Sequence, residues 1–167
     1  ESVYLRALDI CEKALGKDHP NVANSLVSLG DIYVRQALYK KAESALLRAL
    51  AIQEQALGKN HQDVSFTLFI LGGIYEEQGR YDKAESVYLR SLEAQKKSLS
   101  IENTYVSTTF LALGHLYQEQ ALYGKAEAIY LREIEIQEKK LGKDDHTYVS
   151  VLLSYLGSLY YDQALYD

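Results

Sequence analysis

The sequence predicts an all-α protein built as a solenoid of about eight helices that pack in antiparallel pairs. The main observation is an internal repeat: a Leu-Gly-x-x-Tyr pattern recurs around Gly30, Gly72 and Gly114 at a spacing of 42 residues, and around Gly157 after 43. Self-similarity at a fixed period of this length indicates stacked copies of one small unit. Within each copy, apolar residues recur every three to four positions, which is typical of one helix face. No segment has a strong strand pattern.

The first predicted helix runs from Glu1 to Leu15. It ends at Gly16, because glycine readily adopts the left-handed conformation that terminates helices. The next helix begins at Pro20, the only proline, since proline fits the first position of a helix. Either Asp18 or His19 is expected to cap that helix.

The same plan repeats along the rest of the chain. Gly58 ends the third helix as Gly16 ends the first, and short turns separate the two helices of each pair. The one extra residue of the last copy falls in the loop 142–147, where added length costs little. The helices after the first are predicted at 20–35, 40–57, 63–78, 81–99, 104–119, 124–141 and 147–163.

These helices divide into repeats that form a single array over residues 1–167. Segment 1–15 is the second helix of a truncated repeat, and 142–167 contains the first helix of another. Complete repeats are predicted at 16–57, 58–99 and 100–141. Because Glu1 stands in the same repeat phase as Glu43, we expect the chain to be an internal piece of a longer array.

Composition excludes several classes of partner. The net charge of −5 offers no basic surface for nucleic acid or an anionic membrane. The repeated tyrosines occupy packing and turn positions of the repeat, so they do not indicate a platform for stacking bases.

The single Cys11 cannot form an internal disulfide and is expected to be a buried, inert thiol. With no signal peptide and no apolar run of transmembrane length, we expect a cytoplasmic protein.

The pattern Leu-Gly-x-x-Tyr, followed by Ala twelve residues after the Gly and a large residue four later, resembles the tetratricopeptide repeat. These positions are Gly30, Tyr33, Ala42 and Leu46 in the first complete copy. The second and third copies have Gly72, Tyr75, Ala84, Tyr88 and Gly114, Tyr117, Ala126, Tyr130. The long period and the loop from Leu15 to Ala23 are similar to kinesin light chain repeats. They are also similar to tandem repeats of large bacterial, especially cyanobacterial, proteins, some of which carry a caspase-like protease domain.

The resemblance implies a right-handed superhelix whose first helices line a concave inner wall. The wall positions lie six and three residues before each Gly and one and four after it. Val27, Phe69 and Leu111 would then form an apolar stripe, and Asp31 and Glu76 would make the wall acidic. The wall residues are Asn24, Val27, Asp31 and Val34; Phe66, Phe69, Gly73 and Glu76; Thr108, Leu111, His115 and Gln118; and Val151, Ser154, Ser158 and Tyr161.

An apolar stripe facing an open groove is a binding-site signal. The alternative is that adjacent helices or a tighter superhelix cover it. Kinesin light chain repeats usually have two asparagines before the conserved Leu. Those places hold Val27-Ser28 and Phe69-Ile70 here, so recognition through asparagine does not carry over.

No catalytic, cofactor or metal site is predicted. The sequence contains no nucleophile paired with a base and no glycine-rich phosphate loop. His19, His61 and His146 occupy equivalent loops, and points one repeat apart are too distant to share an ion. Capping and loop hydrogen bonds are the better interpretation of these histidines.

The sequence therefore favours a non-catalytic scaffold that binds a peptide or helix with apolar anchors in the concave groove. Two alternatives stay open: a regulatory or structural arm of a larger bacterial enzyme such as a caspase-like protease, with the groove filled by its own chain, and self-association. Self-association would use the ends of the array, through Tyr4, Leu8 or Tyr160.

Overall fold

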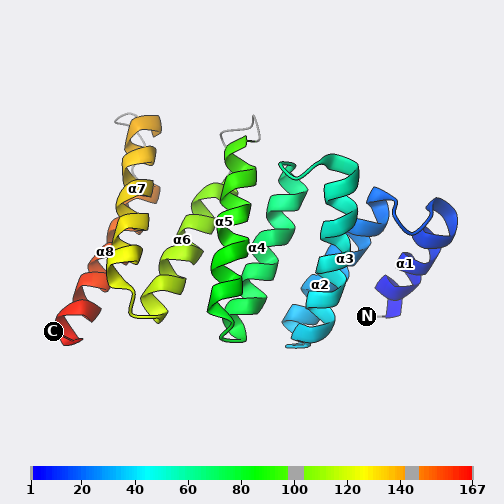
Figure 1. Cartoon of the computed structure of the whole chain (residues 1–167), viewed down its shortest axis with the longest axis horizontal. Helices are drawn as coiled ribbons and strands as arrows, with labels where there is room; N and C mark the ends of the chain where they lie inside the picture. The colour runs from blue at the N-terminus through cyan, green and yellow to red at the C-terminus, as the bar shows by residue number, and fades with distance from the viewer. Residues whose placement is uncertain (1, 98–103, 142–146, 167) are drawn as a thin grey trace. The chain divides into compact units, whose positions relative to one another are not determined.

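A computed structural model describes residues 2–97, 104–141 and 147–166, and every regular element in these ranges is an α-helix (Figure 1). The prediction of eight helices without a sheet is confirmed for this part of the chain. The helices are α1 (Ser2–Leu15), α2 (Pro20–Arg35), α3 (Tyr39–Leu57), α4 (Gln62–Glu77), α5 (Tyr81–Lys97), α6 (Thr104–Glu119), α7 (Tyr123–Leu141) and α8 (Thr147–Tyr166).

The helix ends differ from the predicted ones by a few residues. Helices α3, α4 and α7 each begin one residue earlier than predicted, and α4 also ends one residue earlier, at Glu77. Helix α8 continues to Tyr166 instead of stopping at 163, because Gln163, Ala164 and Leu165 are good helix formers and no Gly or Pro interrupts them. The predicted end of α5 at residue 99 and the loop insertion at 142–146 lie outside the described residues.

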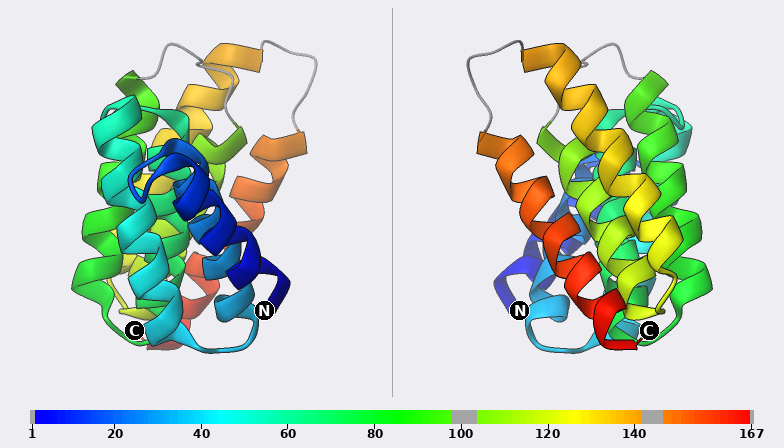
Figure 2. Two further views of the ribbon diagram at one scale, coloured as in Figure 1. Left: turned by 90° about the vertical axis from the view of Figure 1, so that its right-hand side faces the viewer. Right: turned by 90° about the vertical axis from the view of Figure 1, so that its left-hand side faces the viewer.

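The chain divides into two compact units, Glu1–Glu102 and Asn103–Asp167. In the first unit each helix packs on the next along the chain, from α1 to α5. In the second unit α6 packs on α7 and α7 on α8. Figure 2 presents the first unit with α1 nearest the viewer in its left view, and the second with α8 nearest in its right view.

In each complete helix pair the repeated glycine lies directly against a large side chain of the second helix. A Cβ added at Gly30 would lie 2.7 Å from Cγ of Leu46. At Gly72 and Gly114 it would lie 2.6 Å from Cζ of Tyr88 and of Tyr130. The predicted crossings at these three glycines are therefore confirmed.

The expected crossing at Gly157 is wrong, since no atom of another element lies within 4 Å of a Cβ added there. Helix α8 packs on α7, but no described helix follows it to form the second member of its own pair. For the same reason Tyr160 is 45% exposed, although its sequence position predicts a packed tyrosine.

The equivalent tyrosines of the complete repeats are buried and lie under lysines. Tyr33, Tyr75 and Tyr117 are only 5–7% exposed. The ammonium groups of Lys41, Lys83 and Lys125 lie 5.2, 5.7 and 4.9 Å from the centres of those rings. Each repeat thus covers its packed tyrosine with a cation, a contact that stabilises by about 0.5–1 kcal/mol at exposed sites.

Polar contacts recur between consecutive repeats. Thr67 of α4 donates a hydrogen bond of 2.8 Å to Oε1 of Gln53 in α3, and both side chains are buried. One period earlier, the hydroxyl of Ser25 lies 3.9 Å from Sγ of Cys11. Cys11 is only partly buried, so the prediction of a buried thiol is wrong; α1 has no fully buried residue.

Ion pairs join the second helices of successive repeats in the first unit. Arg48 of α3 lies 2.5 Å from Glu12 of α1, and Arg90 of α5 pairs with Glu54 of α3. Arg80 donates two hydrogen bonds, of 2.7 and 3.0 Å, to the carboxylate of Glu43. The bond from Arg80 is the main reason why the pKa of the Glu43 carboxyl is lowered.

Candidate functional site

Helix α2 places the first four wall residues on the side that its core leaves open. Val22, Leu26 and Leu29 are buried, and α2 packs on both α1 and α3. The wall residues fall between these core positions: Asn24 and Asp31 are exposed, and Val27 and Val34 are partly buried. Val27 also packs against the core cluster that contains Leu26.

Helix α4 places its four wall residues in a more enclosed setting. Leu68, Leu71 and Tyr75 fill the core, at 0%, 0% and 5% exposure. The four wall residues are all partly buried: Phe66, Phe69, Gly73 and Glu76. Since α2 and α4 touch within one unit, Val27 and Phe69 belong to two neighbouring helices of the same body.

The second unit holds the other eight wall residues. On α6, Thr108 and His115 are exposed, and Leu111 and Gln118 are partly buried. On α8 all four wall residues are exposed: Val151, Ser154, Ser158 and Tyr161. Every predicted wall residue is therefore accessible to some degree, and none belongs to the buried core.

Sequence reasoning missed the part that Tyr88 plays beside the wall. Its ring is 2% exposed, crosses α4 at Gly72, and lies 5.9 Å from the ring of Phe69 at an interplanar angle of 44°. Its hydroxyl donates a 2.8 Å hydrogen bond to Oε2 of Glu76. Burial, followed by the charge of Glu76, raises the pKa of Tyr88, so the hydroxyl stays a donor. The signal in the sequence was a tyrosine at the large-residue position opposite a glycine.

The third repeat arranges the same residues differently. Tyr130 crosses α6 at Gly114, and its ring stacks on that of Tyr155 at 5.9 Å and 27°. Burial raises the pKa of Tyr130 to about 12. Gln118, which stands where α4 has Glu76, donates to Asp162 of α8, and the Tyr130 hydroxyl has no hydrogen-bond partner among the described residues.

The charged residues of the wall differ in their exposure and in their partners. Asp31 pairs with Arg35 at 2.9 Å in an exposed contact, which partly neutralises it. His115 is exposed, and its Nε2 lies 4.0 Å from Glu119. Glu76 is the carboxylate that is partly buried and held by a tyrosine. The most enclosed negative charge of the wall is therefore on α4.

The loop histidines cap helices, as expected. Nδ1 of His19 accepts from the backbone N–H of Asn21, and Nδ1 of His61 accepts from that of Asp63, both at 3.2 Å. His19 rather than Asp18 is thus the cap of α2. His146 lies outside the described residues. Within the described ranges no group of three His, Cys, Asp or Glu side chains is placed to hold a metal ion.

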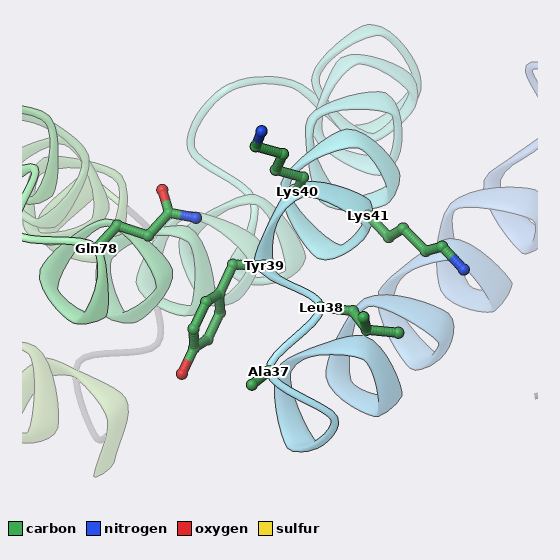
Figure 3. Close-up of a pocket in the computed structure, with 6 residues that line it drawn as sticks. All are labelled: Ala37, Leu38, Tyr39, Lys40, Lys41 and Gln78. Atoms are coloured by element: carbon green, nitrogen blue, oxygen red, sulfur yellow. The ribbon is translucent and has the colours of Figure 1, made fainter.

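Two shallow hollows lie elsewhere in the first unit. One, of about 340 Å³, surrounds the turn between α2 and α3 and reaches Gln78 after α4 (Figure 3). Figure 3 shows that Lys41 extends away from the side on which Tyr39 and Gln78 lie. The other, of about 430 Å³, lies between α2 and α3 and is lined by Leu26, Tyr33, Lys40, Lys41, Ser44, Ala45 and Arg48. Neither contains a predicted wall residue.

No helix in the described part of the chain is both long and apolar enough to span a bilayer. No curated protein matches the chain in sequence. Solved structures do match it. A candidate kinesin light chain of Podosopora anserina with nearly identical TPR-like repeats has a TM-score of 0.85 at 21% identity, covering 98% of this chain and 77% of that one.

BtubC (BKLC) from P. vanneervenii is similarly related in structure, with a TM-score of 0.82 at 22% identity. That match covers 98% of this chain and 65% of the other. At these identities the likeness shows the fold alone, an all-α fold of the kinesin light chain-like TPR type.

Family models agree with the fold. One tetratricopeptide repeat model matches residues 1–55 and 27–97, and a second matches residues 109–143. Together these matches cover well over half of the chain. The 42-residue pattern, the glycine crossings and the family models lead to one conclusion: this chain belongs to the tetratricopeptide repeat family.

Proposed function

We propose that this chain is a non-catalytic scaffold that binds a peptide segment or helix of another protein along the wall formed by its first helices. Tetratricopeptide repeats are protein-interaction modules, and repeat solenoids use extended concave surfaces for binding. The observation that carries the proposal is the partial exposure of Val27, Phe69 and Leu111, while Leu and Tyr residues fill the core positions of the same helices.

The chemistry of the wall fits an apolar anchor with a basic neighbour. Phe69 and Val27 offer apolar surface, and Glu76 adds a negative charge beside it. Burying two such anchors at about 25 cal/mol per Å² leaves modest affinity after the costs of ordering the peptide. We therefore expect micromolar dissociation constants.

The test is a fluorescence titration with peptides selected from a random library against the chain. Phe69→Ala should weaken binding about tenfold, as loss of an interface anchor typically does. Leu89→Ala is the matched control, since Leu89 is also a large apolar side chain, 46% exposed, on α5. It should leave the affinity unchanged.

Thermal melts of both variants accompany the titration, so that loss of binding is separated from loss of folding. The proposal fails if Phe69→Ala binds every selected peptide as tightly as the parent chain. It also fails if Leu89→Ala weakens binding as much as Phe69→Ala does.

Self-association is a second part of the proposal, supported by the exposed apolar side chains of α1 and α8. Of the residues expected to make these contacts, Tyr4 on α1 and Tyr160 on α8 are 43% and 45% exposed, and Leu8 is partly buried. Exposed apolar side chains of this kind favour contacts between copies. Sedimentation velocity across a range of concentrations should show a concentration-dependent increase in mass; a constant monomer mass contradicts it.

A further inference from the structure

We propose that Phe69, Gly73, Glu76 and Tyr88 form a recess, called here the Gly73 notch, that binds an arginine side chain of the peptide. The inference rests on the proposed function and specifies it: it assigns one residue type of the ligand to one place on α4. All four residues lie in the first unit.

The notch follows from the spacing of three residues on one helix. Phe69, Gly73 and Glu76 are four and three positions apart, so their side chains leave α4 on the same face, about one turn from each other. Gly73 has no side chain to fill the space between the other two. A Cβ added there would meet one neighbouring atom, the Tyr88 hydroxyl at 3.9 Å, so the space above Gly73 is open.

Tyr88 holds both sides of the notch in place. Its buried ring contacts the ring of Phe69, and its hydroxyl donates to Glu76. Tyr88 reaches this position because Gly72 lets its ring pass α4. It therefore acts as a positioning residue: it fixes the carboxylate and the aromatic ring at the distance that α4 sets.

An arginine matches these groups better than other side chains do. A guanidinium is planar, stacks on aromatic rings and pairs with carboxylates through parallel hydrogen bonds. A lysine supplies the charge but not the planar stacking. An acidic side chain would meet Glu76 with like charge, at a cost in affinity. The occupant we assign is accordingly an arginine flanked by apolar residues.

The other repeats lack this combination. Where α4 has Gly73, the other three first helices have Asp31, His115 and Ser158, all with side chains of their own. In the first repeat Leu46 replaces the tyrosine and carries no hydroxyl. In the third, Tyr130 is present, but Gln118 stands in place of the carboxylate and donates to Asp162. One arginine at one place on the array would set the register in which a peptide binds.

The experiment uses three blocked pentapeptides that differ at the central residue: acetyl-Leu-Ala-Arg-Ala-Leu-amide and the same peptide with citrulline or glutamate for arginine. Binding to the full chain is followed through the backbone amide signals of α4 in ¹H–¹⁵N NMR spectra. We expect the arginine peptide to bind about fivefold to tenfold more tightly than the citrulline peptide, which is nearly identical in shape but uncharged.

Four variants test whether the preference for the arginine peptide arises at the Gly73 notch. Glu76→Gln should remove it, while the matched control Glu77→Gln changes the same charge one residue away and should keep it. Tyr88→Phe retains the ring but lacks the hydroxyl, so it should reduce the preference for arginine and leave the affinity for the citrulline peptide unchanged. Gly73→Ala should fill the notch and weaken the arginine peptide while raising Tm, because alanine favours the helix and no atom blocks it.

The outcomes separate this proposal from the proposed function. If the peptides bind in a Phe69-dependent manner but with equal affinity, the arginine assignment is wrong and the scaffold proposal stands. If Glu76→Gln and Glu77→Gln reduce the preference equally, it reflects net charge, and the notch is wrong. If none of the three peptides binds, both proposals are contradicted.

Discussion

Replacing Gly72 by alanine tests the close helix crossing that the three complete repeats share. The added methyl would lie 2.5 Å from Cδ1 and 2.6 Å from Cζ of Tyr88, whereas carbon atoms in contact are normally about 3.5–4.0 Å apart. The tyrosine cannot easily retreat, because its ring is 2% exposed, is packed against Phe69 and is hydrogen-bonded to Glu76. Helices α4 and α5 must therefore move apart.

The expected change in the free energy of unfolding is the sum of two opposing contributions. Overpacking a well-filled core costs about 1–3 kcal/mol and occasionally more, and an overlap of about 1 Å with the Tyr88 ring places Gly72→Ala at the upper end. Alanine in a helix interior recovers up to about 1 kcal/mol relative to glycine. We therefore expect Gly72→Ala to lower the free energy of unfolding by about 2 kcal/mol.

Two other glycines provide controls within the same chain. At Gly30 the nearest atom is Cγ of Leu46 at 2.7 Å, and an aliphatic side chain adjusts more easily than a ring, so Gly30→Ala should cost about 1 kcal/mol or less. At Gly157 nothing lies within 4 Å, so Gly157→Ala should stabilise by about 0.5–1 kcal/mol.

Urea unfolding followed by circular dichroism at 222 nm measures all three variants against the parent chain. The expected order of stability is Gly157→Ala, parent, Gly30→Ala, Gly72→Ala. A Gly72→Ala variant as stable as the parent would refute the close crossing, and so would equal losses at Gly72 and Gly157.

Three further predictions concern packing, turns and charge. Ala84→Leu should lower Tm strongly, because Ala84 is 0% exposed, while Ser86→Leu on the exposed side of the same helix should change it little; equal shifts would contradict this packing. Ala37 has φ +55°, which is unfavourable for a residue with a Cβ. Ala37→Gly should therefore leave the free energy of unfolding unchanged or raise it by up to about 1 kcal/mol, as measured by urea unfolding. A decrease of more than about 1 kcal/mol would contradict this reasoning. Arg80 lowers the pKa of Glu43 below its ordinary value of about 4.5, so the stability from this pair is present above that value and is lost as the pH falls through the lowered pKa. Glu43→Gln should therefore reduce the loss of stability at acid pH. An unchanged loss would contradict the pairing.

The helices could be predicted from the sequence because the same pattern of residues occurs in every repeat. Gly30, Gly72 and Gly114 share one spacing, and their crossings are where that spacing places them. The prediction failed at Gly157 and Tyr160, where the sequence position matches but the described residues include no second helix of the α8 pair to pack against them. The repeat pattern predicts which kind of contact a residue can make, but the contact forms only where the second helix of the pair is present.

The wall residues could be assigned from helical phase, but their differences could not. Phase alone treats Glu76 and Gln118 as equivalent, yet one accepts from Tyr88 and the other donates to Asp162. These contacts depend on where the tyrosine of the next helix passes the glycine, which is a matter of three-dimensional packing. Cys11 is a similar case: its phase predicted burial, and the packing of α1 leaves it partly exposed.

The central claim, that partner peptides bind along the wall of the first helices, is tested most directly by mapping a bound peptide. A peptide selected from the random library is titrated into ¹⁵N-labelled and methyl-labelled chain, and the shifted signals are assigned. The account predicts the largest changes at Val27, Phe69 and Leu111, with the exposed leucines Leu47 and Leu89 of the second helices unaffected. Changes concentrated at Leu47 and Leu89, with Phe69 unmoved, would contradict it.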